Sequence, residues 1–141
     1  MAQAAYGQYR KKILDIGVEL FELRGDATIA ASDDAIRSNL HSKFLIFDDE
    51  VVFIGSLNLD PRSLYLNTEL GVALHSEELS QEFRANFELM IHPDNAWRLE
   101  QTPEGILWHS SAGTLKKQPA KNSWQRFSYY FFSLFPISNQ L

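Results

Sequence analysis

The fold is decided by residues 41–58, HSKFLIFDDEVVFIGSLN. Two apolar runs, residues 44–47 and 51–54, are separated only by the three acidic residues 48–50. Short runs rich in β-branched and aromatic residues, joined by a few polar residues, are typical of a hairpin. We therefore expect two adjacent antiparallel strands with a tight turn between them.

The segments after this hairpin predict a further strand and two helices. Asp60-Pro61 is typical of a helix N-cap followed by proline at the first helical position, which predicts a short helical turn just after Asn58. Residues 69–74 read as a third buried strand. Apolar side chains spaced four residues apart predict a helix over residues 77–90.

The N-terminal part adds a helix and a short strand. Apolar residues at three- to four-residue spacing predict a helix over 4–16 that ends at Gly17, and residues 18–23 read as a strand. Residues 26–38 are small and polar, which predicts a loop. Together these elements predict an α/β fold, in which a mixed sheet carries helices on its faces.

Composition excludes several kinds of chemistry. The chain has 141 residues, of which 45% are hydrophobic, enough for one globular unit with a packed core. Cysteine is absent, which excludes disulfides, thiolate nucleophiles and cysteine-bearing metal sites. The first ten residues lack the basic start and apolar run of a secretory signal, so we expect a cytoplasmic location.

Charge is distributed unevenly between the two parts of the chain. The formal net charge is −5, but residues 113–141 hold four basic and no acidic side chains, which leaves −9 on residues 1–112. An acidic body argues against a general nucleic-acid surface, which needs a basic face to collect phosphates. We expect a domain over 1–112 and a separate C-terminal segment over 113–141, whose basic residues are Lys116, Lys117, Lys121 and Arg126.

The C-terminal segment is also aromatic, with seven Trp, Tyr and Phe side chains between residues 124 and 135. Its apolar run is far shorter than the ~20 residues that a membrane-spanning helix needs. Basic and aromatic side chains together suit a contact with the surface of an anionic membrane. Packing of this segment onto the core of the domain is the alternative, and the sequence leaves both open.

His41 and Lys43 are the first candidates for chemistry. Because side chains alternate along a strand, these two share one face, while Asp48 points to the other. An ammonium beside an imidazole can hold a phosphate group while a neutral ring nitrogen attacks phosphorus. We expect Asp48 to stabilise the turn, or an ion pair behind the site, without touching the phosphate.

Three further polar residues follow the second run. Ser56 and Asn58 share a face, and Gly55 before them allows the backbone to approach a bound anion. Asn58 also lies close to the predicted helix start, whose amides suit phosphate oxygens. We expect Glu69 to orient His41 through the ring nitrogen that does not attack.

The pattern His41-x-Lys43-x-x-x-x-Asp48, followed by Gly55-Ser56-x-Asn58, resembles the HKD motif of the phospholipase D superfamily. The stretches at 17–23, 58–63 and 67–71 resemble the second catalytic half of bacterial cardiolipin synthases, most closely the C-type. The resemblance implies one half of a bilobal phospholipase D-like fold. It also implies that His41 attacks phosphorus, that Lys43 and Asn58 hold phosphoryl oxygens, and that Ser56 and Glu69 support them.

The resemblance also predicts the partners of the chain. It implies an anionic phospholipid substrate, peripheral contact with the cytoplasmic face of the membrane, and no cofactor. His75, His92 and His109 lack the spacing of a metal site. Members of the superfamily bring two HKD copies together, whereas this sequence holds one. We therefore expect the second half to come from a homodimer or from a separate chain.

Two alternative functions remain open at this point. One is a homodimeric phosphodiesterase or nuclease with a single HKD motif per chain, which the acidic charge of residues 1–112 disfavours. The other is a fragment that binds lipid without catalysis.

Overall fold

The computed structural model describes residues 2–27 and 41–119. The chain divides into two compact units. Residues 38–90 make up the first, which we call the motif unit because it contains residues 41–58. Residues 1–37 and 91–141 make up the second, which we call the meander unit.

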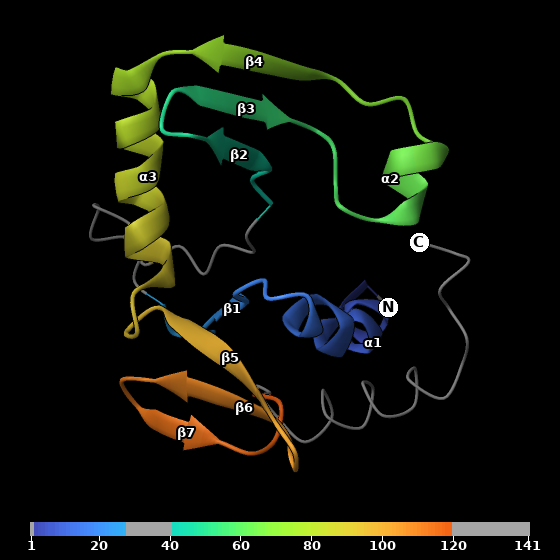
Figure 1. Cartoon of the computed structure of the whole chain (residues 1–141), viewed down its shortest axis with the longest axis vertical. Helices are drawn as coiled ribbons and strands as arrows, with labels where there is room; N and C mark the ends of the chain where they lie inside the picture. The colour runs from blue at the N-terminus through green and yellow to red at the C-terminus, as the bar shows by residue number, and fades with distance from the viewer. Residues whose placement is uncertain (1, 28–40, 120–141) are drawn as a thin grey trace. The chain divides into compact units, whose positions relative to one another are not determined.

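Three antiparallel strands form the sheet of the motif unit, in the order β2-β3-β4 (Figure 1). Their bounds are Phe44–Phe47 for β2, Val51–Gly55 for β3 and Gly71–His75 for β4. The central strand is β3, which pairs through Ile54 with Phe44 and through Gly55 with Gly71. The two apolar runs of the sequence therefore form the hairpin that the sequence predicts.

The turn of this hairpin explains the acidic residues between the runs. Asp48 and Asp49 have positive φ angles of 52° and 60°, and the N–H of Glu50 donates to the carbonyl of Phe47 at 3.0 Å. Two consecutive left-handed residues are the mark of a type I′ hairpin turn. Aspartate tolerates this conformation better than most residues do.

Helix α3 (Glu77–Ile91) packs against one face of this sheet and confirms the helix predicted over 77–90. The ring of Phe83 meets the ring of Phe44 edge-on, with 5.1 Å between centroids. Val52 lies in the same layer and is fully buried. Arg84 of α3 also forms an ion pair with Asp49, which ties the hairpin turn to the helix.

Strand β4 differs from the predicted third strand in two ways. It begins at Gly71 instead of residue 69, and all five of its residues are exposed, so the prediction of a buried strand is wrong. The physical reason is its position, because β4 is an edge strand of the described sheet. Val72 of this strand is 54% exposed.

The short helical turn predicted after Asn58 is α2 (Pro61–Tyr65). The backbone of Asp60 is extended, and its side chain accepts a hydrogen bond from the N–H of Ser63 at 2.9 Å. This N-cap satisfies one of the N–H groups that a helix start leaves unpaired. The Asp60-Pro61 signal is therefore confirmed.

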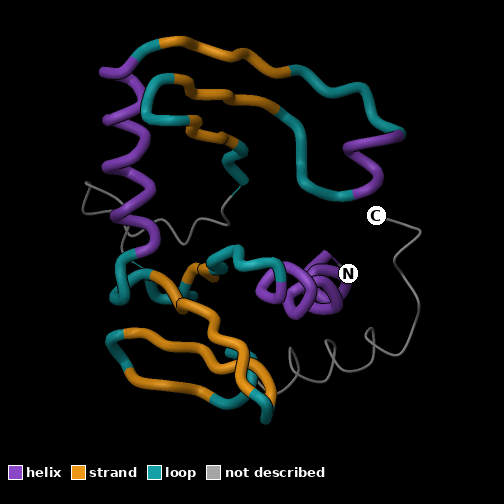
Figure 2. Tube along the Cα trace, in the orientation of Figure 1, coloured by secondary structure: helices purple, strands orange, loops and turns teal. Residues whose placement is uncertain are grey.

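The meander unit holds α1 and a second antiparallel sheet, in the order β1-β5-β6-β7 (Figure 2). The bounds are Ala2–Asp15 for α1, Phe21–Leu23 for β1, Ala96–Thr102 for β5, Gly105–Ser110 for β6 and Gly113–Leu115 for β7. The sequence predicted α1 and, with an earlier start, β1. Gly17 ends α1 as expected, since its φ of 86° is left-handed and Val18 donates its N–H back to the carbonyl of Ile13 at 3.3 Å.

A buried ion pair joins α1 to the sheet of the meander unit. Arg10 is only 6% exposed, and its Nε donates to Oε1 of Glu22 at 2.6 Å. The indole of Trp108 donates to the other carboxylate oxygen at 3.0 Å, and Gln118 accepts from Nη1 of Arg10 at 3.1 Å. The guanidinium also lies 4.7 Å from the ring centre of Tyr6. The ion pair of Arg10 and Glu22 thus connects α1, β1, β6 and the segment after β7.

Some expectations fall on residues that the structure does not describe. Residues 28–38 of the predicted loop and the aromatic run at 124–135 lie outside the described residues. Residues 113–115 form β7 in the sheet of the meander unit. The predicted domain division between residues 112 and 113 stays a prediction. Within residues 2–27 and 41–119, no helix is both long and apolar enough to cross a bilayer.

We expect Glu22→Ala to lower the free energy of unfolding by about 3 kcal/mol, because it leaves the buried Arg10 charge uncompensated. The matched control is Glu19→Ala, which breaks an ion pair with Arg98 whose side chains are both 63% exposed. That control should cost less than about 1 kcal/mol. Denaturant unfolding measures both, and equal losses in the two variants would contradict this assignment of Arg10.

Candidate active site

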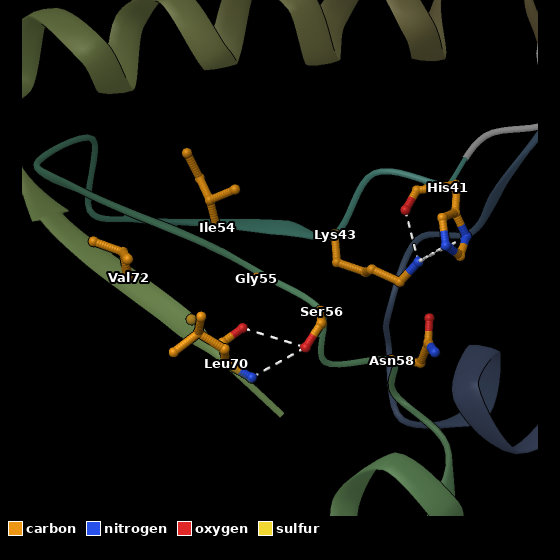
Figure 3. A pocket seen from close by; sticks show the side chains of 9 residues that line it. His41, Lys43, Ile54, Gly55, Ser56, Asn58, Leu70 and Val72 are labelled. Carbon is orange, nitrogen blue, oxygen red and sulfur yellow. Dashed lines mark hydrogen bonds between the residues drawn. The ribbon is translucent and has the colours of Figure 1, made fainter. Parts of the chain in front are cut away.

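A pocket opens at the end of the motif-unit sheet where β2, β3 and β4 bring their termini together (Figure 3). It is lined by His41, Lys43, Ile54, Gly55, Ser56, Asn58, Leu70, Gly71 and Val72. Four of the six site residues predicted from the sequence are in this set. Glu69 lies directly beside it in sequence, and Asp48 lies in the hairpin turn.

His41 and Lys43 meet in the pocket (Figure 3). The ammonium of Lys43 lies 2.8 Å from Nδ1 of His41 and 3.3 Å from Nε2, and it donates to the His41 carbonyl at 2.6 Å. Because an ammonium can only donate, the nearer ring nitrogen is the acceptor. The pair therefore brings a positive charge into contact with the imidazole ring.

The two residues come before the strand and not inside it. β2 begins at Phe44, so the placement of His41 and Lys43 within the first strand is wrong. The hydrogen bond from the N–H of Gly55 to the carbonyl of Lys43, at 3.1 Å, carries the strand pairing one residue further. This contact fixes the backbone of Lys43 beside the end of β3, while His41 lies beyond the ladder.

Ser56 connects β3 to the residues just before β4. Its Oγ donates to Oε2 of Glu69 at 2.5 Å and accepts from the N–H of Leu70 at 3.1 Å. Its own N–H donates to the carbonyl of Leu70 at 2.9 Å. A hydroxyl bonded to a carboxylate at this distance is a strong, charge-assisted contact. Ser56 thus holds Glu69 at the rim of the pocket.

The carboxylate of Glu69 is held in its charged form. Hydrogen bonds from Ser56, Ser63 and Asn67 lower the pKa of Glu69 below its ordinary value, with Ser56 as the largest cause. The positive charge of Lys43 acts in the same direction, as a smaller cause. In this arrangement Glu69 contacts Ser56 and Asn67, while Lys43 contacts the ring of His41, so the orientation of His41 by Glu69 stays a prediction.

Asn58 lies between the end of β3 and α2. Its Nδ2 donates to Oγ of Ser63 at 3.4 Å, and Ser63 is only 4% exposed. The sequence analysis did not identify Ser63 as a site residue. The available signal was its position three residues after the Asp60 cap, which points its backbone N–H at the cap and leaves its hydroxyl for other partners.

Gly55 and Gly71 face each other across the floor of the pocket. A Cβ atom on Gly71 would lie within 2.1 Å of the ring of Phe53, and one on Gly55 within 2.8 Å of the Leu70 carbonyl. Neither distance is compatible with a side chain. The sequence linked Gly55 to the approach of an anion, whereas the structure shows that close strand packing already requires glycine there.

Asp48 takes part in the hairpin turn, where its φ is positive. The ion pair at this turn belongs to its neighbour Asp49, which contacts Arg84. Among the histidines outside the pocket, His75 lies 3.7 Å from Glu50 and His109 lies 2.8 Å from Glu100. No cluster of three potential metal ligands occurs in the part of the chain that the structure describes.

Comparison with known proteins identifies the family. Residues 1–91 match the family described as cardiolipin synthase, PLD-like domain. The chain belongs to this family. The family confirms the phospholipase D-like α/β half-domain that the HKD resemblance implied, and places the His41 pocket within the matched residues.

Relatives of this PLD-like domain are much longer proteins. Cardiolipin synthase C of Escherichia coli K12 is 38% identical over 97% of this chain and 31% of its own length. Cardiolipin synthase B of the same strain is 33% identical over 70% of this chain and 21% of its own length. An uncharacterized protein of Helicobacter pylori J99 is 33% identical over 74% of this chain and 23% of its own length. The chain spans no more than 31% of the length of these relatives. No solved structure matches it.

In this PLD-like domain, Ser56→Ala should raise the pKa of Glu69 toward its ordinary value, because the largest stabiliser of the charged form is removed. A lowered carboxyl pKa favours the folded state above the unfolded-state pKa, and this contribution is lost as pH falls through the folded-state value. Carboxyl titration by NMR measures the change. The control is Ser80→Ala, which alters a fully buried serine on α3. An unchanged Glu69 titration in Ser56→Ala would contradict this role of Ser56.

Proposed function

We propose that this chain supplies one catalytic half of an enzyme that transfers phosphatidyl groups through a covalent phosphohistidine. The observation that carries the proposal is the contact of the Lys43 ammonium with the ring of His41 inside a pocket that also presents Ser56 and Asn58. A cation next to the nucleophile can leave the ring for the oxygens of a bound phosphodiester, where it stabilises the charge that develops as the ring nitrogen attacks. Cardiolipin synthases among the relatives support the transfer of phosphatidyl groups.

The first step forms the intermediate. A ring nitrogen of His41 attacks phosphorus of an anionic phospholipid, so that a P–N bond forms as the P–O bond to the leaving alcohol breaks. Lys43 and Asn58 hold the non-bridging oxygens, whose negative charge increases in the transition state. The leaving oxygen takes a proton from a general acid, which the second half provides.

The second step reverses these roles. An acceptor alcohol attacks the phosphorus of phosphohistidine, a P–O bond forms, and the P–N bond to His41 breaks. The same group of the second half that gave its proton to the leaving alcohol now takes the proton of the acceptor. One imidazole cannot be nucleophile and general acid at once, and His41 is the only histidine among the residues that line the described pocket. A homodimer or a separate chain would therefore complete the site.

The lining of the pocket favours a lipid substrate over a nucleic acid. One side carries His41, Lys43, Ser56 and Asn58, and the other consists of apolar Ile54, Leu70 and Val72. Leu70 is 79% exposed, so the apolar side continues out of the pocket. An anionic phosphate joined to an apolar body fits such a surface. The basic, aromatic segment at 113–141 would add peripheral contact at the cytoplasmic face of the membrane.

The direct test is phosphatidyl transfer by the purified chain on vesicles of phosphatidylglycerol. His41→Ala should lower the rate at least about a thousandfold, since it removes the nucleophile. The matched control is His75→Ala, because the side chain of His75 is 74% exposed and lies outside the pocket. Activity that survives in His41→Ala would overturn the proposal, and cleavage of DNA by the wild-type chain would favour the single-motif nuclease.

The requirement for a second half has its own test. Light scattering of the chain at micromolar concentration, with and without anionic lipid, should show a dimer wherever transfer activity occurs. A monomer that catalyses transfer would contradict the two-half mechanism. A monomer that is inactive but binds anionic vesicles would instead support the lipid-binding fragment.

A further inference from the structure

Residues 57–70 form a loop whose two ends are joined, and we call it the α2 loop because it carries α2 (Figure 1). It starts where β3 ends and stops just before β4. The N–H of Ser56 donates to the carbonyl of Leu70 at 2.9 Å, and the N–H of Leu70 donates to Oγ of Ser56 at 3.1 Å. Compact loops that are closed in this way are frequently functional.

The polar groups of the α2 loop are paired with one another. The carboxylate of Asp60 accepts from the N–H of Ser63, which is buried. Nε of Arg62 donates to Oδ1 of Asn67 at 3.3 Å, and Nδ2 of Asn67 donates to Oε1 of Glu69 at 3.2 Å. An arginine only donates and a charged carboxylate only accepts, so the amide of Asn67 fits between them in one orientation. The loop is therefore held in shape by its own hydrogen bonds.

The large apolar side chains of the α2 loop, in contrast, are exposed. Leu59 is 82% exposed, Tyr65 and Leu66 are each 80% exposed, and Leu70 is 79% exposed. These are the four most exposed large hydrophobic side chains in the part of the chain that the structure describes. Single exposed hydrophobic residues are normal, but a cluster of them marks a surface that binds a partner or a membrane. The α2 loop thus has its polar groups occupied and its apolar groups presented outward.

This apolar surface is continuous with the pocket. Asn58 and Leu70, near the two ends of the α2 loop, both line the pocket together with His41, and Figure 3 shows both beside Ser56. The pocket has a volume of about 520 Å³, which is the size of a site for a drug-sized molecule. Such a pocket can hold the phosphate of a phospholipid, while the two acyl chains stay outside it.

The acyl chains decide what must lie against the mouth of the pocket. Each CH₂ group that leaves a bilayer for water disfavours the transfer about fourfold, so a lipid with two long chains does not leave the bilayer to reach His41. The pocket must instead come to the surface of the membrane. The exposed side chains of the loop that borders the pocket then meet the lipid. Tyr65 suits this position, because tyrosine has an apolar ring and a polar tip and is enriched at membrane interfaces.

We propose that the α2 loop is a lipid-contact surface, whose four exposed apolar side chains enter the interface of a phospholipid bilayer while the pocket binds a headgroup phosphate. This inference rests on the proposed function, because the phospholipid substrate belongs to it. It places a membrane contact inside the motif unit, whereas the sequence analysis placed one only at residues 113–141. A second copy of this chain is the competing occupant of the same surface, and the experiments distinguish the two.

The first test observes the environment of the loop directly, with no need for activity. Because the chain has no cysteine, Leu66→Cys gives a single thiol that can carry a polarity-sensitive fluorophore. On phosphatidylglycerol vesicles the emission of this label should shift to the blue, and lipids with a spin label on the acyl chain should quench it. The matched control is Ile16→Cys, since Ile16 is 77% exposed and belongs to the meander unit, and its label should show neither effect.

Three results of this test would overturn the proposal. A label at residue 66 that stays in water while the chain sediments with vesicles would place the membrane contact elsewhere, such as at residues 113–141. A blue shift that requires only a higher protein concentration, with no quenching by spin-labelled lipid, would show that a second copy covers the loop. A chain that does not sediment with vesicles at all would have no lipid contact.

The second test compares two forms of the substrate. Leu66→Ser should lower the rate of phosphatidyl transfer on phosphatidylglycerol vesicles at least about tenfold, because burial of a leucine side chain contributes that much to binding. On a short-chain phosphatidylglycerol dissolved as single molecules, the rate should stay within about twofold of the wild type, since this substrate needs no contact with a bilayer. Ile16→Ser is the control and should change neither rate. Equal losses on both substrates would show that Leu66 acts through the fold of the site and would contradict the proposal.

The two tests separate the inference from the function on which it rests. If the wild-type chain transfers phosphatidyl groups from neither substrate, the proposed function fails, and the label at residue 66 still decides whether the α2 loop contacts lipid. If transfer occurs but the label shows no contact with lipid, the proposed function stands and the lipid-contact surface is wrong.

Discussion

The hydrogen bonds at one end of the motif-unit sheet are the constraint on which the candidate site depends. Gly55 donates its N–H to the carbonyl of Lys43, and Ser56 donates its N–H to the carbonyl of Leu70. Through these two bonds, the end of β3 fixes both the segment that carries Lys43 and the segment that carries Glu69. The pairing of Gly55 with Gly71 lets the strands approach where a Cβ atom would collide. These contacts bring Lys43 and Leu70, which are far apart in the sequence, into the same pocket.

The backbone of the motif unit places the two opposite charges of the site at different positions. Lys43 directs its positive charge toward His41 and the interior of the pocket, while Glu69 receives hydrogen bonds at the rim. The hydroxyl of Ser56 and the amide of Asn67 donate to Glu69, so its negative charge is stabilised mainly by neutral donors. The cation is therefore left for the ring of His41 and for an anionic ligand. This separation of opposite charges within one small site suits the binding of a phosphate.

Much of the motif unit was predictable because its signals are local. The hairpin follows from two apolar runs around three acidic residues, and α2 follows from Asp60-Pro61. The exposure of β4 was not predictable, because its apolar residues match a buried strand while its position at the sheet edge is a tertiary property. The meander β5-β6-β7 was not assigned either, although Gly105 and Gly113, both with positive φ, mark its two turns.

The most direct test of the central claim is the detection of a phosphoryl group on His41. The full chain, mixed with phosphatidylglycerol vesicles and its second half where one is needed, would be quenched in alkali, which preserves phosphohistidine, and mapped by peptide mass spectrometry. We predict a phosphatidyl adduct on the peptide that contains His41, lost when an acceptor alcohol is added in excess. Turnover with no adduct on His41 under any quench time, or an adduct on another residue alone, would contradict the account.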